Sequence, residues 1–374
     1  MTNPPPPGNW GPPQPPYGQG QPPYGSGAWP PQQGWGPPQP PIKNNSLKWL
    51  LIGVAVLLVI AISVGATLLF TRDGGGGTTQ AANGNPPAAG EIASANDTGP
   101  VSIITEDPTC EPWRPIISTL ANQQRQGWDK RNYAVPSSSW NAADRQLHEA
   151  TADAMRRAAD QTLGLAKLTP HRIMRELYEQ SVAYWRAYAD AIPTYTPINN
   201  SLAVTASDTS DSITSICGAI DNGAAAARRP LVNSSNPAAG SAAPPRPLES
   251  PETFIGASES EFCAEWSQLV KRFEADSTAW REWDATDPAS DWTPDHRNMM
   301  ESVSPIMTGF AEDTQALGAQ SGNALVADFA RLSSQYFLAY VQAIPSYTSA
   351  DSYLSSVGTL GYLMVFNACA AVGS

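Results

Sequence analysis

The chain has 374 residues, with 22 basic and 34 acidic side chains and a formal net charge of −12. Residues 1–72 hold only three of the basic residues and no acidic one, so the rest of the chain is strongly acidic. Because binding to nucleic-acid phosphates needs clustered lysine and arginine, this charge distribution argues against a nucleic-acid-binding protein. The length is sufficient for two domains of ordinary size.

Residues 1–48 form a tail rich in Pro, Gly and Gln, and 16 of the 36 prolines of the chain lie within its first 41 residues. Proline is excluded from helix interiors and cannot donate in a sheet ladder, and the tail shows no aliphatic periodicity. We therefore expect a disordered, partly polyproline II tail. Its repeated "PPYG" suits a proline-binding groove, and a solvated spacer is the alternative.

Residues 49–70, "WLLIGVAVLLVIAISVGATLLF", carry no charged side chain. At about 1.5 Å per residue, a helix of this length spans roughly 33 Å, which matches a hydrocarbon core of about 30 Å. Lys43 and Lys48 precede the segment, whereas Arg72 and Asp73 cancel one another after it. The positive-inside rule then predicts a single-pass protein of the cell membrane, with a cytoplasmic N-terminus and an extracytoplasmic C-terminal region.

The composition of the tail and the membrane segment resembles the Pro/Gly/Gln/Tyr-rich tails of many single-pass membrane proteins of mycobacteria and related actinobacteria. The resemblance rests on residues 1–72 and implies an envelope context. It implies no particular activity, since such tails precede many unrelated extracytoplasmic domains.

The remaining sequence contains an internal repeat. Residues 71–100 are expected to form a flexible stalk, and residues 223–256 a linker rich in Pro, Ala and Ser. Two repeats, residues 101–222 and 257–374, align along their whole length, at an offset of 153 residues near their first cysteines and 152 residues further on. The phrase "AIPTYT" in the first repeat recurs as "AIPSYT" in the second.

Each repeat predicts four amphipathic helices, and we expect an all-α protein with two tandem four-helix bundles. Asn141 and Thr293 are suitable N-caps for the second helix of each repeat. The third helix is expected to start after Thr169 or Ser321. The first helix shows the pattern most clearly, with apolar residues at i, i+3, i+4 and i+7: Trp113, Ile116, Ile117 and Leu120.

The four cysteines fit this architecture. In an up-down-up-down bundle, the start of the first helix and the end of the fourth lie at the same end. The repeat therefore predicts the disulfides Cys110–Cys217 and Cys263–Cys369, in a compartment where disulfides persist. Zinc binding is the rival interpretation, but the cysteines are widely spaced without a CxxC or HxxxH partner. We expect no metal and no cofactor.

No catalytic motif is recognisable, and the expected protein is not an enzyme. His148, His171 and His296 have no histidine at the matching position of the other repeat, so surface or cap roles are expected. The acidic pair Asp208 and Asp211 is interpreted as part of a solvated helix face.

Aromatic and arginine residues that match between the repeats are the candidate ligand site. A cleft lined by tyrosine with one arginine suits a glycan, a peptide or an anionic lipid headgroup. The alternative is that the aromatic rings fill the bundle cores. The candidate residues are Arg145, Tyr188, Tyr195, Arg297, Tyr340 and Tyr347.

These features together favour a membrane-anchored envelope protein with a tandem helical interaction module. Its expected role is that of a scaffold or accessory subunit with protein partners in the envelope. Binding of a lipid, glycan or cell-wall ligand is the alternative, and a cell-wall hydrolase is a more remote one. The sequence indicates neither the partner nor the oligomeric state.

Overall fold

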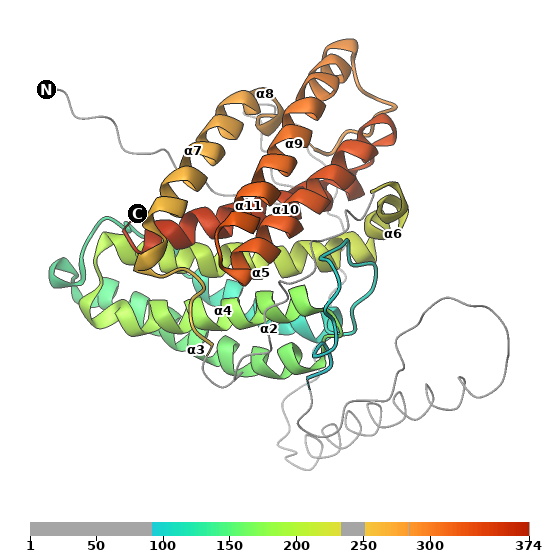
Figure 1. Cartoon of the computed structure of the whole chain (residues 1–374). Helices are drawn as coiled ribbons and strands as arrows, with labels where there is room; N and C mark the ends of the chain where they lie inside the picture. The colour runs from blue at the N-terminus through green and yellow to red at the C-terminus, as the bar shows by residue number, and fades with distance from the viewer. Residues whose placement is uncertain (1–91, 233–250, 284, 374) are drawn as a thin grey trace, which may run out of the picture. The chain divides into compact units, whose positions relative to one another are not determined.

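The computed structural model describes residues 92–232, 251–283 and 285–373 (Figure 1). These residues form helices joined by short segments, with no strand among them, so the predicted all-α fold is confirmed. The predicted tail (1–48), the membrane span (49–70) and most of the expected stalk and linker lie outside the described residues.

The first repeat is a closed bundle of four long helices. Helix α2 packs against both α3 and α5, and α4 packs between α3 and α5. The bounds of the long helices are Cys110–Gln124 (α2), Ala142–Leu168 (α3), Arg172–Ala191 (α4) and Asn200–Asp221 (α5). Short helical turns complete the repeat: η1 (Trp128–Lys130), η2 (Ser137–Ser139), η3 (Ile192–Thr194), η4 (Pro197–Asn199), α6 (Ala224–Arg228) and η5 (Arg229–Leu231).

The second repeat has the same architecture. Helix α7 packs against α9 and α11, and α10 packs between α9 and α11. The long helices are α7 (Ser260–Asp276), α9 (Pro294–Gln320), α10 (Ala324–Ala343) and α11 (Ser352–Ala371). The short ones are η6 (Ala257–Glu259), α8 (Thr278–Arg281), η7 (Ile344–Ser346) and η8 (Ser349–Asp351). The prediction of two tandem four-helix bundles is thus confirmed.

The helix caps explain where these helices begin. The side chain of Asn141 accepts a hydrogen bond from the backbone N–H of Asp144, and Thr293 accepts from that of His296, so both predicted caps are present. The third helices begin slightly later than predicted. Thr169 is the C-cap of α3, and its hydroxyl accepts from the backbone N–H two residues on, at His171. This local turn delays the start of α4.

The two repeats pack directly on each other and belong to one compact unit. Helix α5 lies along α11, and α4 contacts α10 (Figure 1). Gly218 near the end of α5 lies against the Tyr353 ring at the start of α11, and Ile198 just before α5 lies near Gly373 just after α11. Helices α5 and α11 are therefore antiparallel, and the repeats are related by a local two-fold pseudosymmetry.

Within the described residues, the segment Ser349–Ala371 is long and apolar enough to cross a membrane, with a mean hydropathy of 1.4. That mean applies to an 18-residue window of the segment, and 67% of this window is buried inside the fold. Because α11 packs against α5, α7 and α10, a central place in the bundle accounts for its apolar composition.

Candidate functional site

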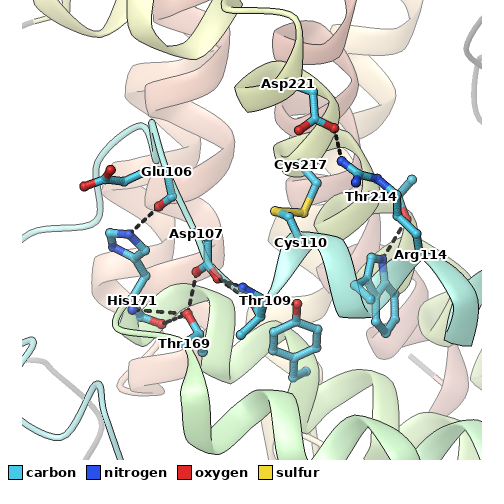
Figure 2. Close-up of a disulfide and its surroundings, with 12 residues drawn as sticks. Glu106, Asp107, Thr109, Cys110, Arg114, Thr169, His171, Thr214, Cys217 and Asp221 are labelled. Carbon is cyan, nitrogen blue, oxygen red and sulfur yellow. Dashed lines mark hydrogen bonds and ion pairs between the residues drawn. A yellow bond between two sulfur atoms is a disulfide. The ribbon is translucent and has the colours of Figure 1, made fainter. Parts of the chain in front are cut away.

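A disulfide closes each repeat at the end where its first and fourth helices meet. Cys110 at the start of α2 bonds to Cys217 near the end of α5, and Cys263 in α7 bonds to Cys369 in α11 (Figure 2 shows the first). The predicted pairing is confirmed. Both bonds close loops of more than 100 residues, which constrains the unfolded chain strongly.

The segment before α2 is fixed beside the first disulfide by a buried carboxylate. Asp107 accepts hydrogen bonds from the backbone N–H of Thr109 (2.8 Å) and from the hydroxyls of Thr109 and Thr169 (2.6 Å for the latter; Figure 2). The ring of His171 bonds to the carbonyl oxygen of Glu106 (2.9 Å). These contacts join the entry to α2 with the connection between α3 and α4.

The four candidate tyrosines lie in the cores of the repeats, and each has an exposed fraction of at most 1%. Trp128 donates its indole N–H to the Tyr188 hydroxyl (2.9 Å), and Trp280 donates to Tyr340 in the same way (2.9 Å). The hydroxyls of the other two donate to backbone carbonyls, from Tyr195 to Tyr133 (2.9 Å) and from Tyr347 to Ala285 (2.7 Å). The structure therefore places these rings in the bundle cores, as in the second of the two interpretations, and not along an open cleft.

The doubled phrase is a structural corner that each repeat uses once. The backbone N–H of Ser137 donates to the carbonyl of Tyr195, and Ala289 donates to Tyr347, both at 2.9 Å. The turns η3 and η7 contain the prolines of the phrase, and α4 and α10 end directly before them. The corner thus holds the connection between the third and fourth helices against the loop before the second helix.

The two candidate arginines differ from the tyrosines because neither is buried in the core. Arg145 donates to the carbonyl of Ser137 and Arg297 to that of Ala289, each at 3.1 Å. Arg145 also lines an open groove of about 400 Å³ between α3 and the end of α4. None of the four candidate tyrosines lines this groove; its other lining residues are Glu149, Ala152, Asp153, Arg156, Ala189, Ile192 and Pro193.

His148 is buried, so the prediction of a surface role is wrong for it. Its ring stacks on Trp140 with 3.9 Å between centroids, and its Nδ1 lies 3.0 Å from the Tyr188 hydroxyl. Burial and the nearby Arg131 guanidinium lower the pKa of His148 to about 4. The second repeat has Met300 at the matching position, also fully buried, so the site is a core position in both repeats.

Two non-helical segments lie at the contact between the repeats, and each precedes one repeat while also contacting the other. Strap 1, residues 92–107, leads into α2, but its Ile104 N–H donates to the hydroxyl of Tyr336 on α10 (3.2 Å). Strap 2, residues 251–256, leads toward α7, but its Phe254 ring packs against the Tyr184 ring on α4. Tyr184 and Tyr336 occupy matching positions, so the exchange of straps is reciprocal.

Aromatic packing reinforces strap 2. The Phe254 ring lies between Tyr184 of α4 and Phe329 of α10, with centroid distances of 5.8 and 5.0 Å. Gln180 of α4 donates to the carbonyl of Glu252 (3.0 Å), and Asn323 donates to that of Phe254 (2.6 Å). Strap 2 therefore touches both repeats along the α4–α10 contact.

Charged groups fill the part of the α4–α10 contact that lies next to strap 1. We call this part the seam. Arg172 of α4 pairs with Asp328 of α10, and both are almost completely buried. Arg172 also donates to two strap 1 carbonyls, at Asp97 (3.0 Å) and Gly99 (2.8 Å). The carboxylate of Asp97 in turn accepts from the backbone N–H of Arg172 (2.7 Å) and so caps α4. One arginine thus joins strap 1, α4 and α10.

Two further polar contacts hold the repeats together away from the seam. Arg228 of α6 donates through two nitrogens to Asp351 before α11, both at 2.9 Å. Asn367 of α11 donates to Asp208 of α5 (2.7 Å). Asp208 is buried, which raises the pKa of its carboxyl, so the interpretation of Asp208 as part of a solvated face is wrong.

Residues 92–373 match the model of a family described as Mycobacterial ESX-1 associated protein. The chain belongs to this family. It is also 45% identical over 335 residues to an uncharacterised protein of Mycolicibacterium smegmatis, and the alignment covers 88% of this chain and 87% of the relative. No solved structure matches the chain.

The family match begins at strap 1 and ends after α11, so it includes both straps, both disulfides and the seam. The mycobacterial context expected from the tail agrees with the family and with the relative. The proline-rich and single-pass details remain predictions, since residues 1–91 lie outside the described residues.

The seam was not anticipated from the sequence, because charged side chains on an amphipathic helix normally face solvent. A signal is nevertheless present in the repeat alignment. Arg172, Arg175 and Gln180 of α4 match Ala324, Ala327 and Leu332 of α10. Small or apolar residues at these positions of α10 indicate that this face of the helix is buried. The matching face of α4 is then expected to be buried too, although it carries polar residues.

Proposed function

We propose that this protein is an accessory component that works with ESX-1 secretion components in the mycobacterial envelope, and that it acts by binding rather than by catalysis. The binding body is the pair of disulfide-closed repeats joined at the seam. A membrane anchor before strap 1 keeps this body at the outer side of the cell membrane.

The extent of the family match carries this proposal. The match spans residues 92–373, which include both straps and both repeats and exclude the tail and residues 49–70. We therefore assign the association with ESX-1, which the family description names, to the two repeats and not to the tail.

The disulfides support the extracytoplasmic side of the membrane. All four cysteines of the chain are paired, and two disulfides that each close a large loop are typical of an oxidising compartment. The flanking charges of residues 49–70 independently favour the same orientation.

Secretion from a deletion strain tests the proposal. Without the gene, a mycobacterial strain should release less ESX-1 substrate into the culture filtrate, and the full chain should restore release. A variant that ends at residue 100 keeps the tail and the segment 49–70 but lacks both repeats, and it should fail to restore release at equal membrane abundance. Full restoration by this truncated variant would contradict a role for the repeats.

Ligand binding is a second candidate, and the open groove beside Arg145 is the observation that favours it. The groove presents Arg145 and Arg156 together with Glu149 and Asp153. An anionic cell-wall fragment or lipid headgroup would engage the arginines. Peptidoglycan fragments and anionic lipids should then raise the melting temperature of the full chain, and the substitution Arg145→Ala should abolish the shift. No shift with either ligand class counts against this candidate.

A further inference from the structure

Glu176 of α4 lies at the centre of the seam in an unusual environment. Its side chain is fully buried, with 0% exposed, and neither carboxyl oxygen has a hydrogen-bond partner among the described residues. The nearest cationic nitrogens belong to Arg172, at 3.6 Å, and to Arg175, at 3.8 Å. Both exceed a hydrogen-bond distance.

The repeat explains why Glu176 has no close arginine. Its matching residue is Asp328, which pairs with Arg172 across the seam. Pseudosymmetry would pair Glu176 with the residue that matches Arg172, but that residue is Ala324. The seam therefore contains one of two reciprocal ion pairs, and Glu176 is the acid whose arginine is missing.

Both arginines near Glu176 are already used to hold strap 1. Arg172 donates to the carbonyls of Asp97 and Gly99, and Arg175 donates to the hydroxyl of Ser94 (3.2 Å). A charged Glu176 would attract the same two guanidinium groups. The carboxylate and strap 1 are therefore competitors for Arg172 and Arg175.

The charges around Glu176 balance when it is neutral. Strap 1 contributes Asp97, α4 contributes Arg172, Arg175 and Glu179, and α10 contributes Asp328 and Arg331. Among these buried and half-buried groups three cations face three anions, while Arg229, which lines the pocket beside Asp97 and Arg172, is exposed to solvent. An ionised Glu176 would add a buried charge without a hydrogen-bond partner, which is costly. Burial raises the pKa of Glu176 to about 8, opposed by Arg172 and Arg175 and reinforced by Glu179 and Asp97.

We propose that strap 1 is a proton-controlled latch: it is held on the seam while Glu176 carries a proton, and it is released when the Glu176 carboxylate forms and takes Arg172 and Arg175 from it. The step is a simple acid dissociation, in which the proton passes to solvent. Since strap 1 connects the segment that leads to the predicted membrane anchor with α2, release would lengthen the tether between anchor and body and uncover the Tyr336 side of α10.

The sign of the pH dependence follows from the raised pKa. The folded carboxyl keeps its proton to about pH 8, whereas the unfolded one loses it near 4.5. The stabilising effect of the neutral group is complete below about pH 4.5 and is lost as the pH rises through 8. At one unit above the folded pKa, the latch should be weakened by about tenfold.

Hydrogen exchange of the full chain tests the latch. Protection of peptides covering residues 93–106 is measured between pH 6.5 and 9.0, corrected for the intrinsic exchange rate, with α3 peptides as an internal reference. We expect protection of strap 1 to fall about tenfold over this range while that of α3 stays constant. Glu176→Gln, which mimics the neutral acid, should keep strap 1 protected at pH 9.0.

A second variant keeps the test decisive if the glutamine variant does not fold. Ala324→Arg supplies the missing reciprocal arginine, so Glu176 can ionise without taking Arg172 or Arg175 from the strap. Strap 1 should then stay protected across the whole pH range. Constant protection in the wild-type protein, or an unchanged pH response in Ala324→Arg, would overturn the proposal.

Discussion

Arg172 and Asp328 form a buried ion pair that joins helix α4 of the first repeat to helix α10 of the second. Arg172 also donates hydrogen bonds to two backbone carbonyl oxygens of strap 1, so one side chain connects three separate parts of the chain. Together with the packing of α5 along α11 and the reciprocal straps, this pair joins the two repeats into one body. The repeat in the sequence is equally compatible with two independent bundles.

Removal of one partner of this pair should be strongly destabilising. Asp328→Ala leaves the Arg172 guanidinium buried without its carboxylate, and the expected loss is about 3–5 kcal/mol in the free energy of unfolding. Urea denaturation followed by circular dichroism measures it.

A surface pair provides the matched control. Arg156 and Asp190 are also bonded, at 3.0 Å, but their side chains are 43% and 74% exposed. Asp190→Ala should therefore change the free energy of unfolding by less than about 1 kcal/mol. Equal effects of the two substitutions would show that the seam does not depend on the buried pair.

The disulfides should contribute similarly to the two repeats, because their loops are nearly equal, with separations of 107 and 106 residues. Replacement of either pair by alanine should lower the free energy of unfolding by about 2–5 kcal/mol. Urea midpoints measured with and without reductant check this prediction. A wild-type midpoint that does not respond to reductant would be inconsistent with it.

Two glycines in helices should respond to alanine in opposite directions. A Cβ on Gly361 of α11 would lie 2.9–3.0 Å from backbone and Cβ atoms of Ser333 on α10, so Gly361→Ala should force these helices apart and lower the melting temperature. Gly164 of α3 has no atom within 4 Å of the same position. Gly164→Ala should stabilise by up to about 1 kcal/mol through helix propensity. Calorimetry of both variants measures these changes in melting temperature. An unchanged melting temperature for Gly361→Ala would argue against the close α10–α11 packing.

His148 should make the fold sensitive to acid. Its pKa is lowered to about 4 in the folded state, against 6.5 for an ordinary histidine, so the unfolded chain binds more protons between these values. Its contribution is complete above about pH 6.5 and falls by up to about 3 kcal/mol as the pH drops to 4. Unfolding free energies at pH 7 and pH 4 measure the loss.

The other repeat supplies the test variants for this prediction. His148→Met introduces the residue that the second repeat has at this position and should reduce the acid sensitivity. His171→Asn likewise introduces the matching residue of the second repeat and serves as the control for replacing a histidine outside the core. The interpretation fails if His148→Met retains the full pH response.

The repeat alignment was sufficient to predict the helices and the disulfides. Matching cysteines, caps such as Asn141 and Thr293, and apolar spacing are local signals, and each appears twice in the sequence. The corner around Pro193 and Pro345 was predictable for the same reason, because proline ends a helix wherever it follows the last turn.

The seam could not be predicted in this way, because it depends on contacts between the repeats. Arg172 and Asp328 are 156 residues apart, and neither residue type indicates burial. The strap residues Ile103 and Ile104 lie next to a Gly- and Pro-rich stretch that resembles a stalk, yet their side chains are only 3% exposed. Packing between distant segments set these environments, and local sequence patterns carry little information about it.

Crosslinking in living mycobacteria with a membrane-impermeant reagent tests whether the two repeats bind ESX-1 secretion components outside the cell membrane. The full chain and a variant that ends at residue 100 are purified after treatment, and their crosslinked partners are identified by mass spectrometry. We expect ESX-1 secretion components to be captured by the full chain and not by the truncated variant. Equal capture by both, or capture only with a membrane-permeant reagent, would contradict an extracytoplasmic binding role for the two repeats.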